Sequence, residues 1–287
     1  MIGFQDSITF VIVTFNSHQV INKCIESISS NNKIIIIENS KDYSIKDSLE
    51  SKYKNVEVII AGDNLGYGKG NNLGISKVKT QYAFILNPDA YLEKNTIEEL
   101  KKAKLFLKDK FSIMAPNFYN NYGYFSKNKY FDISNKILEV DYVKGFAMLL
   151  NLKNIKFKPI FDENFFLFLE EIDLCKRIKS HNENIYLITN SKVYHTEKKG
   201  SGDSLEVELC RNWHWMWSLY YYNLKNSGRL TAYNIAFKKS FLLIIKMLIS
   251  LIFFNKKKNL MYKYRLFGLI NSILNKPSWI RPENIKI

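Results

Sequence analysis

Four short apolar runs between residues 8 and 90 each end in a cluster of polar residues. The runs are Ile8–Thr14, Lys33–Ile37, Val56–Ala61 and Tyr82–Leu86. Stretches with helical periodicity separate them, and this alternation predicts βαβ units on a parallel sheet. Because the carboxyl ends of parallel strands meet at one edge of an open sheet, the four polar clusters should line a single crevice.

The remaining pattern extends this α/β arrangement and then becomes helical. A fifth strand is expected at Phe111–Ala115, ended by Pro116, and residues 117–135 are expected to form a loop or hairpin. From Asp203 the pattern is helical to about Asn275. We therefore predict a domain at 1–224 and a helical region at 225–287. The other expected elements are helices at Gln19–Ser30, Ile45–Lys52, Gly70–Lys77, Thr96–Lys108 and Glu170–His181, and strands at Val140–Leu150 and Ile185–Thr189.

The net charge of +15 lies mostly in the last part of the chain. Residues 225–287 contain 13 lysines and arginines and one acid, Glu283, which gives this segment a charge of +12. Residues 1–224 are close to neutral at +3. This asymmetry indicates a polyanionic partner for the C-terminal segment, either a membrane surface or a nucleic acid.

A nearly continuous apolar segment, Phe241–Phe254, precedes Lys256, Lys257 and Lys258. As a helix it would be about 21 Å long, whereas the hydrocarbon layer of a bilayer is about 30 Å thick. The segment therefore predicts an interfacial helix beside a basic patch. The alternative is a helix packed on the rest of the protein with a solvated basic rim.

The sequence lacks the features of a secreted protein. It enters Ile8–Thr14 without a basic and then apolar leader, so we expect no signal peptide. Its three cysteines, Cys24, Cys175 and Cys210, form no CxxC pair and no zinc pattern. Reduced, packed thiols are the expectation.

Asn64–Gly74 is a glycine-rich segment that includes Gly66, Gly68 and Gly70. Glycines let the backbone approach a ligand closely, and the start of a helix offers free N–H groups to phosphate. A tight turn between strand and helix explains the spacing equally well. The segment is not a dinucleotide fingerprint, because it follows the third strand of the unit rather than the first.

Two residues at strand ends are candidates for a metal site. Asp89, in Asn87-Pro88-Asp89, follows an apolar strand, and a carboxylate beside a phosphate-binding loop can bridge Mg²⁺ or Mn²⁺ to a diphosphate. His195 ends Val193–His195 and would complete a mixed oxygen and nitrogen site for Mn²⁺. A plain Asn-Pro-Asp turn and a structural histidine are the alternatives.

Three acids, Glu170, Glu171 and Asp173, follow an aromatic run and begin a predicted helix. The helix dipole favours negative charge in a first turn, and Asp173 is spaced to pair with Arg177, so a purely structural role is a good account. The apolar stretch upstream supports a second interpretation, because burial would raise a carboxyl pKa and suit it to general-base catalysis.

Taken together, the order of these motifs resembles family 2 glycosyltransferases, over about residues 8–225. The closest subgroup is the bacterial rhamnosyltransferase-like enzymes of O-antigen and capsule assembly. The resemblance implies the GT-A fold, a Rossmann-like α/β domain with a mainly parallel central sheet and flanking helices, here with a C-terminal helical extension.

The resemblance also implies roles for individual residues. Asp89 is similar to the last acid of the metal-binding DxD motif and would bind Mn²⁺ or Mg²⁺ together with His195. Glu171 stands where the family's usual base is Asp, with Glu170 and Asp173 beside it. Glu38 likewise stands in for an Asp. The implied nucleotide-sugar-binding residues are Thr14, Phe15, Asn16, Glu38, Asn39, Asn64, Gly66, Tyr67, Gly68, Asn72, Asn87 and Gly145.

The implied reaction moves a sugar, with inversion, from dTDP-rhamnose or a UDP-hexose to a hydroxyl of a lipid-linked or growing surface polysaccharide. The expected partners are that donor, that acceptor and an anionic membrane surface, with no nucleic acid. The implied location is cytoplasmic, peripheral on the inner face of the cytoplasmic membrane. This scheme requires Asp89, His195 and Glu171 to converge around one pyrophosphate.

Three other functions stay open. A nucleotidyltransferase would share the sheet and the acids, but Phe15-Asn16-Ser17-His18 lacks a basic triphosphate loop. A non-catalytic membrane- or RNA-binding protein would explain the basic tail but leave the acids at 89 and 170–173 without a role. An inactive transferase is the third, because Asn87 replaces the first acid of the DxD motif.

Overall fold

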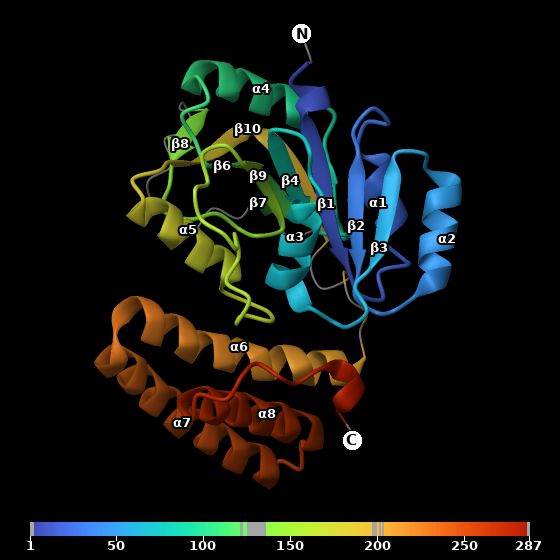
Figure 1. Ribbon diagram of the computed structural model, residues 1–287. Coiled ribbons are helices and arrows are strands. Elements are labelled where there is room, and N and C mark those ends of the chain that lie inside the picture. Colours follow the sequence, from blue (N-terminus) through green and yellow to red (C-terminus); the bar gives the residue numbers. More distant parts are fainter. Residues whose placement is uncertain are drawn as a thin grey trace. The chain divides into compact units, whose positions relative to one another are not determined.

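A computed structural model describes residues 3–120, 123–124, 136–196, 200, 202 and 204–285 (Figure 1). Its contacts divide the chain into two compact units. The first comprises Met1–Phe161 and Leu174–Gly202, and the second comprises Asp162–Asp173 and Asp203–Ile287. Each unit is described by itself below.

The first unit is built on one mixed sheet whose strands follow the order β3-β2-β1-β4-β9-β6-β10-β5. The pairs β1/β2, β2/β3, β1/β4 and β6/β10 are parallel, and the pairs that involve β9 or β5 are antiparallel. Two short strands, β7 and β8, pair with β6 and β10. The strands are β1 (Ile8–Thr14), β2 (Ile34–Glu38), β3 (Val56–Ile60), β4 (Tyr82–Leu86), β5 (Ala90–Leu92), β6 (Ile113–Asn120), β7 (Gly123–Tyr124), β8 (Ile137–Glu139), β9 (Ala147–Asn151) and β10 (Ile185–His195).

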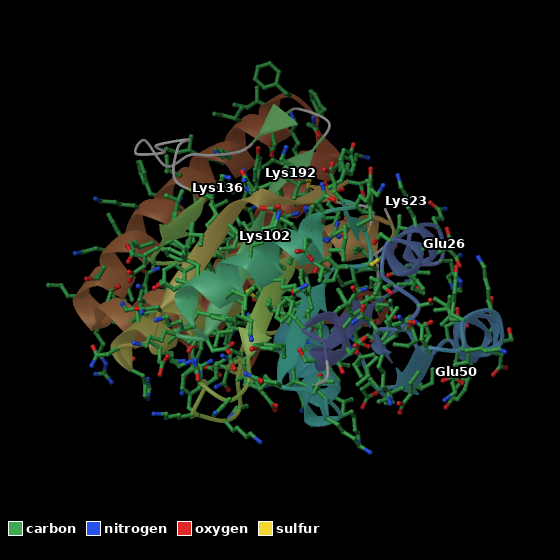
Figure 2. The ribbon with its side chains drawn as sticks, turned by 90° about the horizontal axis from the view of Figure 1, so that it is seen from above. Lys23, Glu26, Glu50, Lys102, Lys136 and Lys192 are labelled. Carbon is green, nitrogen blue, oxygen red and sulfur yellow. The ribbon has the colours of Figure 1, made fainter. Side chains whose placement is uncertain are left out.

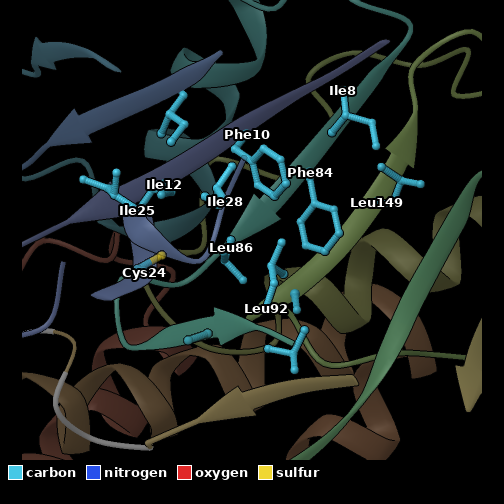
Figure 3. Close-up of a cluster of buried hydrophobic side chains, with 14 of the residues drawn as sticks. Ile8, Phe10, Ile12, Cys24, Ile25, Ile28, Phe84, Leu86, Leu92 and Leu149 are labelled. Carbon is cyan, nitrogen blue, oxygen red and sulfur yellow. The ribbon is translucent and has the colours of Figure 1, made fainter. Parts of the chain in front are cut away.

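The core of this unit lies on both faces of the sheet, because successive side chains of a strand point to opposite faces. On one face Phe10 of β1 stacks on Phe84 of β4 with ring centroids 5.0 Å apart (Figure 3). On the other face Val11 and Ile85, the next residues along the same strands, belong to a second apolar cluster. Burial on both sides explains why these strands read as uninterrupted apolar runs.

Helices connect the parallel strands as the sequence predicts, with shifted ends. They are α1 (Ile21–Glu26), α2 (Tyr43–Lys52), α3 (Gly66–Ser76) and α4 (Thr96–Leu107), and α5 (Glu170–Ser180) runs from the second unit into the first. Glu50 of α2, which Figure 2 labels, accepts a hydrogen bond from the Val58 N–H of β3 at 2.8 Å. Lys46 donates to the Val58 carbonyl at 2.9 Å. These contacts fix α2 to β3, and they satisfy the N–H and the carbonyl of Val58 on an edge strand of the sheet.

Two strand predictions were wrong in detail. Pro116 does not end a strand, because β6 continues through it to Asn120. The pairing of β6 with β9 ends at Met114, so at Pro116 β6 pairs with β10 alone. The missing N–H of a proline is tolerated at a position that has a strand on one side only. The run Val140–Leu150 is not one strand, because Gly145 lies in a turn before β9 begins.

The second unit packs three long helices, α6 (Leu205–Ser227), α7 (Arg229–Ile252) and α8 (Lys256–Ile273), which confirms the helical pattern after Asp203. Gly268 of α8 lies against the backbone of α6, where an added Cβ would stand 2.1 Å from the Trp213 carbonyl oxygen. Trp213 and Trp217 are buried in an apolar cluster of this unit. Among the described helices, none combines the length and the apolar character that a membrane span needs.

Candidate active site

Asp89 and His195 lie together in the first unit although 105 residues separate them in the chain. Asp89 follows β4, and His195 ends β10 opposite Ala90 of β5. The Asp89 Oδ1 atom is 3.3 Å from the His195 Nε2 atom, and both side chains are largely buried. Thr196 donates its N–H and its hydroxyl to the Asp89 carbonyl, each at 3.0 Å. The antiparallel β5/β10 pairing therefore brings the two candidate metal ligands together.

The turn before β9 supports this pair from one side. The imidazole of His195 stacks on the Phe146 ring, with centroids 4.3 Å apart and planes 8° apart. Gly145, the preceding residue, accepts a hydrogen bond from the Tyr67 hydroxyl at 2.5 Å. Asn87 donates its N–H to the Phe146 carbonyl at 2.8 Å. Tyr67, Asn87 and Gly145, predicted from three separate motifs, are thus joined around the residue that orients His195.

The ends of β1 and β2 carry a buried hydrogen-bonded carboxylate. Thr14 donates its hydroxyl to Glu38 Oε2 at 2.6 Å, and the Ser40 N–H donates to Glu38 Oε1 at 2.5 Å. The Ser40 hydroxyl also contacts Glu38 Oε1. The longer arm of Glu38, compared with Asp, is therefore turned toward Ser40. A carboxylate offers about four acceptor positions, so Glu38 keeps capacity for a ligand.

Asn39 connects these strand ends to the glycine-rich loop. Its N–H donates to the Thr14 carbonyl at 2.9 Å, and its amide donates to the Gly66 carbonyl at 3.1 Å. Asn64 accepts from the Gly66 N–H at 3.2 Å. Gly66 has a φ of +76°, which favours glycine, and it begins α3, whose first turn includes Gly68. The start of α3 is thereby held beside the ends of β1 and β2.

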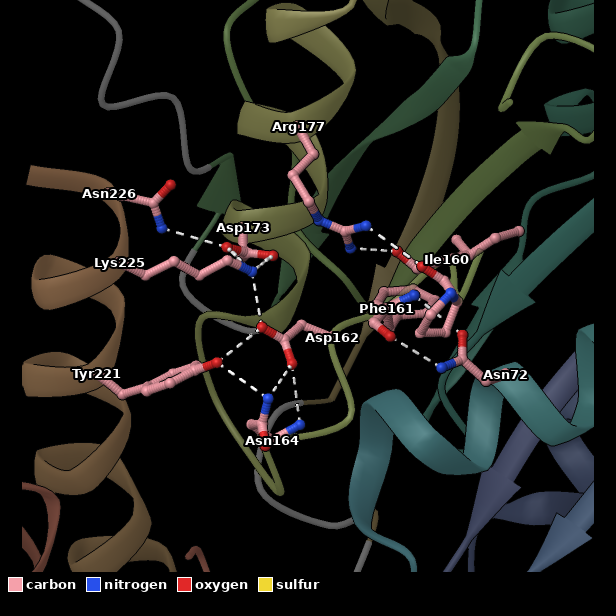
Figure 4. Close-up of polar contacts among 11 residues, drawn as sticks. Asn72, Ile160, Phe161, Asp162, Asn164, Asp173, Arg177, Tyr221, Lys225 and Asn226 are labelled. Atoms are coloured by element: carbon pink, nitrogen blue, oxygen red, sulfur yellow. Dashed lines mark hydrogen bonds and ion pairs between the residues drawn. The ribbon is translucent and has the colours of Figure 1, made fainter. Parts of the chain in front are cut away.

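Asn72, from the predicted set, and Gly74, at the end of the glycine-rich segment, have local roles. Asn72 donates to the Phe161 carbonyl and accepts from the Phe161 N–H, both at 2.9 Å, so its side chain fixes the backbone where the first unit ends (Figure 4). Gly74 permits close packing, since an added Cβ would meet Val11 Cγ1 at 2.4 Å. Nucleotide binding by Asn72 stays a prediction.

Ser17 and Gly200, which lie beside the predicted residues Phe15 and Asn16, were not singled out in the sequence. The Ser17 hydroxyl donates to the Gly200 carbonyl at 2.6 Å, which joins the end of β1 to the segment after β10. Phe15 donates its N–H to Ser17 at 3.1 Å, and Asn16, with a φ of +54°, donates its N–H to Ser40 at 3.3 Å. A left-handed backbone at a residue other than glycine often marks a functional site, and this feature of Asn16 is visible only in the structure.

The second unit contains the candidate general bases. Glu170 is buried, and its Oε2 atom is without a hydrogen-bond partner among the described residues. Burial, followed by the charge of Glu171, raises the pKa of Glu170 well above its ordinary value. The two residues before it, Phe168 and Leu169, both have left-handed backbone conformations. A perturbed acid next to an unusual backbone is typical of functional sites, and it has a physical cause here.

Asp173 is held by an ion-pair network within the second unit (Figure 4). Its side chain is fully buried and lies 2.9 Å from Lys225 Nζ, and Asn226 donates to it at 3.2 Å. Lys225 also lies 2.6 Å from Asp162. Burial would raise the pKa of Asp162, but hydrogen bonds from Lys225, Asn164 and Tyr221 outweigh it, and the pKa is lowered. The network ties the start of α5 to the end of α6.

The structure thus groups the nucleotide and metal candidates of the first unit at the carboxyl ends of β1, β2 and β4. The acids at 170–173 belong to the other unit. Convergence of Glu171 with Asp89 and His195 therefore stays a prediction, as do the catalytic roles of Glu170, Glu171 and Asp173.

The donor set suits a divalent metal. Asp89 and His195 offer one carboxylate and one imidazole within reach of each other, which matches the preferences of Mn²⁺. In the part of the chain that the structure describes, no three His, Cys, Asp or Glu side chains cluster closely enough to hold an ion by themselves. Oxygens of a bound diphosphate and of water would complete the coordination, as is usual where Mg²⁺ or Mn²⁺ binds with phosphates.

This mixed α/β sheet with flanking helices is the architecture of GT-A glycosyltransferases. Residues 9–163 match the sequence profile described as "Glycosyl transferase family 2". The match covers more than half of the chain, so the chain belongs to glycosyl transferase family 2.

Similar proteins agree with this membership. The low-salt glycan biosynthesis hexosyltransferase Agl10 of Haloferax volcanii is 24% identical over 200 residues, which are 63% of this chain. The chain spans 64% of that relative's length.

Solved structures share the fold. Residues 1–349 of S. aureus TarS in complex with UDP give a TM-score of 0.54 at 14% identity, over 94% of this chain and 92% of that one. GalNAc-T7 with UDP, GalNAc and Mn²⁺ gives 0.55 at 14% identity, over 78% of this chain and 51% of that one. These similarities confirm the predicted GT-A fold.

Proposed function

We propose that this protein is a metal-dependent, inverting hexosyltransferase that uses a nucleotide-diphosphate sugar. The observation that carries the proposal is the Asp89–His195 pair, 3.3 Å apart at the edge where Thr14, Glu38 and Asn64 also lie. Membership of glycosyl transferase family 2 supports it. The hexosyltransferase name of the Haloferax relative supports a hexose.

The donor is proposed to lie along the ends of β1, β2 and β4, with its diphosphate near Asp89. Mn²⁺ or Mg²⁺ held by Asp89 and His195 would offset charge on the diphosphate. The first N–H groups of α3 would add hydrogen bonds to the phosphate oxygens, because a helix start favours anions. TarS and GalNAc-T7 structures contain UDP, which supports a UDP-hexose, and dTDP-rhamnose stays the alternative from the subgroup resemblance.

Glu171 is proposed to accept the proton of the acceptor hydroxyl as that oxygen attacks the anomeric carbon. Burial and the charge of Glu171 raise the pKa of Glu170, so Glu170 holds its proton to higher pH and is the less suitable base. Attack from the face opposite the leaving diphosphate inverts the anomeric configuration.

The acceptor is proposed to be a lipid-linked or growing surface polysaccharide, such as an O-antigen or capsule intermediate. This assignment rests on the subgroup resemblance and on the basic C-terminal segment, which carries +12. It places the protein at the inner face of a cytoplasmic membrane, bound peripherally.

Isothermal titration calorimetry with UDP and Mn²⁺ tests the metal site. Replacing Asp89 by Asn should weaken Mn²⁺-dependent UDP binding by about tenfold or more, because the loss of a residue that supports a bound metal typically lowers metal affinity by about 10-fold to 100-fold. Replacing the exposed Asp141 by Asn is the matched control and should change nothing. If the Asp89→Asn variant binds UDP with the same Mn²⁺-dependent affinity as the unaltered protein, this site is excluded.

Turnover measurements test the base. Glu171→Gln should lower the rate of sugar transfer by about 100-fold to 10,000-fold and leave UDP binding unchanged, because only proton acceptance is lost. The Glu170→Gln variant tests whether Glu170 rather than Glu171 is the base. Replacement of the exposed Glu98 by Gln is the control. Full activity of Glu171→Gln together with loss in Glu170→Gln would transfer the role to Glu170.

A further inference from the structure

One face of α7 exposes large apolar side chains over the whole helix. From Phe237 onward they recur at intervals of three or four residues, and Leu230 lies seven residues before Phe237, so they lie on one side of the helix. Phe237 is 76% exposed, and Phe254, just after the helix, is 88% exposed. We call this face the α7 stripe, and its principal residues are Leu230, Phe237, Phe241, Ile244, Leu248 and Ile252.

The α7 stripe is not needed to hold α7 in its unit. The opposite side of the helix buries Ala232, Ala236 and Leu243 in a cluster with Met216 of α6 and Leu269 of α8. The helix is therefore already fixed by its other face. An apolar surface of this extent usually marks a site where something else covers it.

A group of lysines lies next to the end of the stripe. Lys256, Lys257 and Lys258 form the first turn of α8, directly after Phe253, Phe254 and Asn255, and that turn contains no acid. Positive charge at a helix start opposes the helix dipole, so this placement costs local stability. Asn255 caps the helix by accepting from the Lys258 N–H at 3.0 Å, which offsets part of that cost. Lys257 forms an exposed ion pair with Glu208 at 2.7 Å, so Lys256 and Lys258 carry most of the charge that this turn offers to an anionic partner.

Only one kind of partner satisfies both features together. A lipid bilayer offers hydrocarbon to the stripe and anionic headgroups to the lysines beside it. RNA would bind the lysines but leave phenylalanines in water. A second copy of the chain would cover the stripe but bring lysines of like charge together.

We propose that α7 lies in the plane of an anionic membrane surface, with the α7 stripe inserted between lipids and the lysines of early α8 on the headgroups. At 24 residues the helix is about 36 Å long. The proposal rests on the proposed function, for which it supplies the surface that a lipid-linked acceptor requires. It extends the predicted interfacial segment, Phe241–Phe254, to the full helix from Leu230.

Co-sedimentation with vesicles tests the proposal on the full chain. Vesicles of phosphatidylcholine mixed with phosphatidylglycerol should carry the protein down at low salt and release it progressively as salt rises. Vesicles of phosphatidylcholine alone should bind it much less. No sedimentation with the anionic vesicles at low salt would overturn the proposal.

Matched variants locate the contact. Replacing Phe237, Phe241 and Leu248 by Gln should weaken vesicle binding by about 100-fold, from the apolar area lost. Phe106→Gln on α4 removes an equally exposed phenylalanine, 76%, from the other unit and should have no effect.

The charged part is tested in the same way. Replacing Lys256, Lys257 and Lys258 by Gln should weaken binding by about 100-fold at low salt and little at high salt. A triple Gln variant of the exposed Lys54, Lys79 and Lys110 removes the same charge elsewhere as the control. Equal losses in this control would mean that net charge, and not this surface, drives binding.

Two further measurements separate the outcomes. Light scattering would detect a dimer of the unaltered protein. If the unaltered protein is a dimer that does not bind vesicles, and the variant of Phe237, Phe241 and Leu248 is a monomer, the α7 stripe binds a second copy of the chain instead of lipid. Calorimetry with UDP and Mn²⁺ should give the same affinity in every variant. Vesicle binding without UDP binding would refute the sugar-transfer function and keep the membrane surface, and UDP binding without vesicle binding would do the reverse.

Discussion

Lys225 is expected to be a main source of stability in the second unit. Its Nζ atom lies 2.6 Å from Asp162 and 2.9 Å from the fully buried Asp173. In Lys225→Met the length of the side chain is nearly kept, but Asp173 becomes a buried carboxylate without its cation. Removal of one partner from a buried pair costs about 3–5 kcal/mol, and we expect the lower end, about 3 kcal/mol, because Lys225 itself is 31% exposed.

The chain offers a convenient assay for this loss. All four tryptophans, Trp213, Trp215, Trp217 and Trp279, belong to the second unit. Intrinsic tryptophan fluorescence during urea unfolding therefore reports on the unit that contains Lys225. Linear extrapolation then gives the free energy of unfolding.

Two variants make this prediction refutable. Adding Asp173→Asn to Lys225→Met should restore part of the stability, because a neutral amide no longer needs the cation. Lys257→Met breaks an exposed pair with Glu208 and should cost about 0.5 kcal/mol or less. If Lys225→Met costs no more than Lys257→Met, or if Asp173→Asn restores nothing, the argument from buried charge is wrong.

Two further predictions use the same fluorescence assay. Burial lowers the pKa of His214 to about 3, so its stabilising effect is complete above about pH 6.5 and is lost as pH falls toward 3. The free energy of unfolding should drop by about 2 kcal/mol between pH 6.5 and pH 5 relative to a His214→Gln variant, and parallel pH profiles would refute this. Gly268→Ala should cost about 2 kcal/mol, because the new Cβ would stand 2.1 Å from the Trp213 carbonyl oxygen. The exposed Lys263→Ala is its control, and an equal effect would show that helix packing is not responsible.

The sequence predicted the sheet best where strands are buried on both faces. The runs 34–37 and 82–86 consist of apolar and aromatic residues, and their position in the chain identified them as parallel strands. Prediction was poorer where pairing depends on distant segments. The continuation of β6 through Pro116 depends on where β9 stops and where β10 begins to pair, which no local pattern contains.

The candidate site shows the same contrast. Asp89 and His195 were paired from the order of motifs, and their 3.3 Å separation agrees with that pairing. The Ser17–Gly200 hydrogen bond and the stacking of Phe146 on His195 were not predicted, because they join segments through tertiary contacts alone. Gly74 had been grouped with the phosphate loop, yet its close contact with Val11 gives it a packing role.

The segment Asp162–Asp173 belongs to the helical unit although strands of the sheet unit precede and follow it in the chain. Asp162 is bonded to Tyr221 and Lys225, and Ser218 donates to the Leu167 carbonyl at 2.7 Å. A truncation that ends before α6 would therefore also remove the supports of Glu170 and Glu171. The carboxylates proposed for proton transfer and the helices proposed for lipid contact belong to one compact unit, so a chimaera that exchanges the C-terminal helices must also exchange residues 162–173.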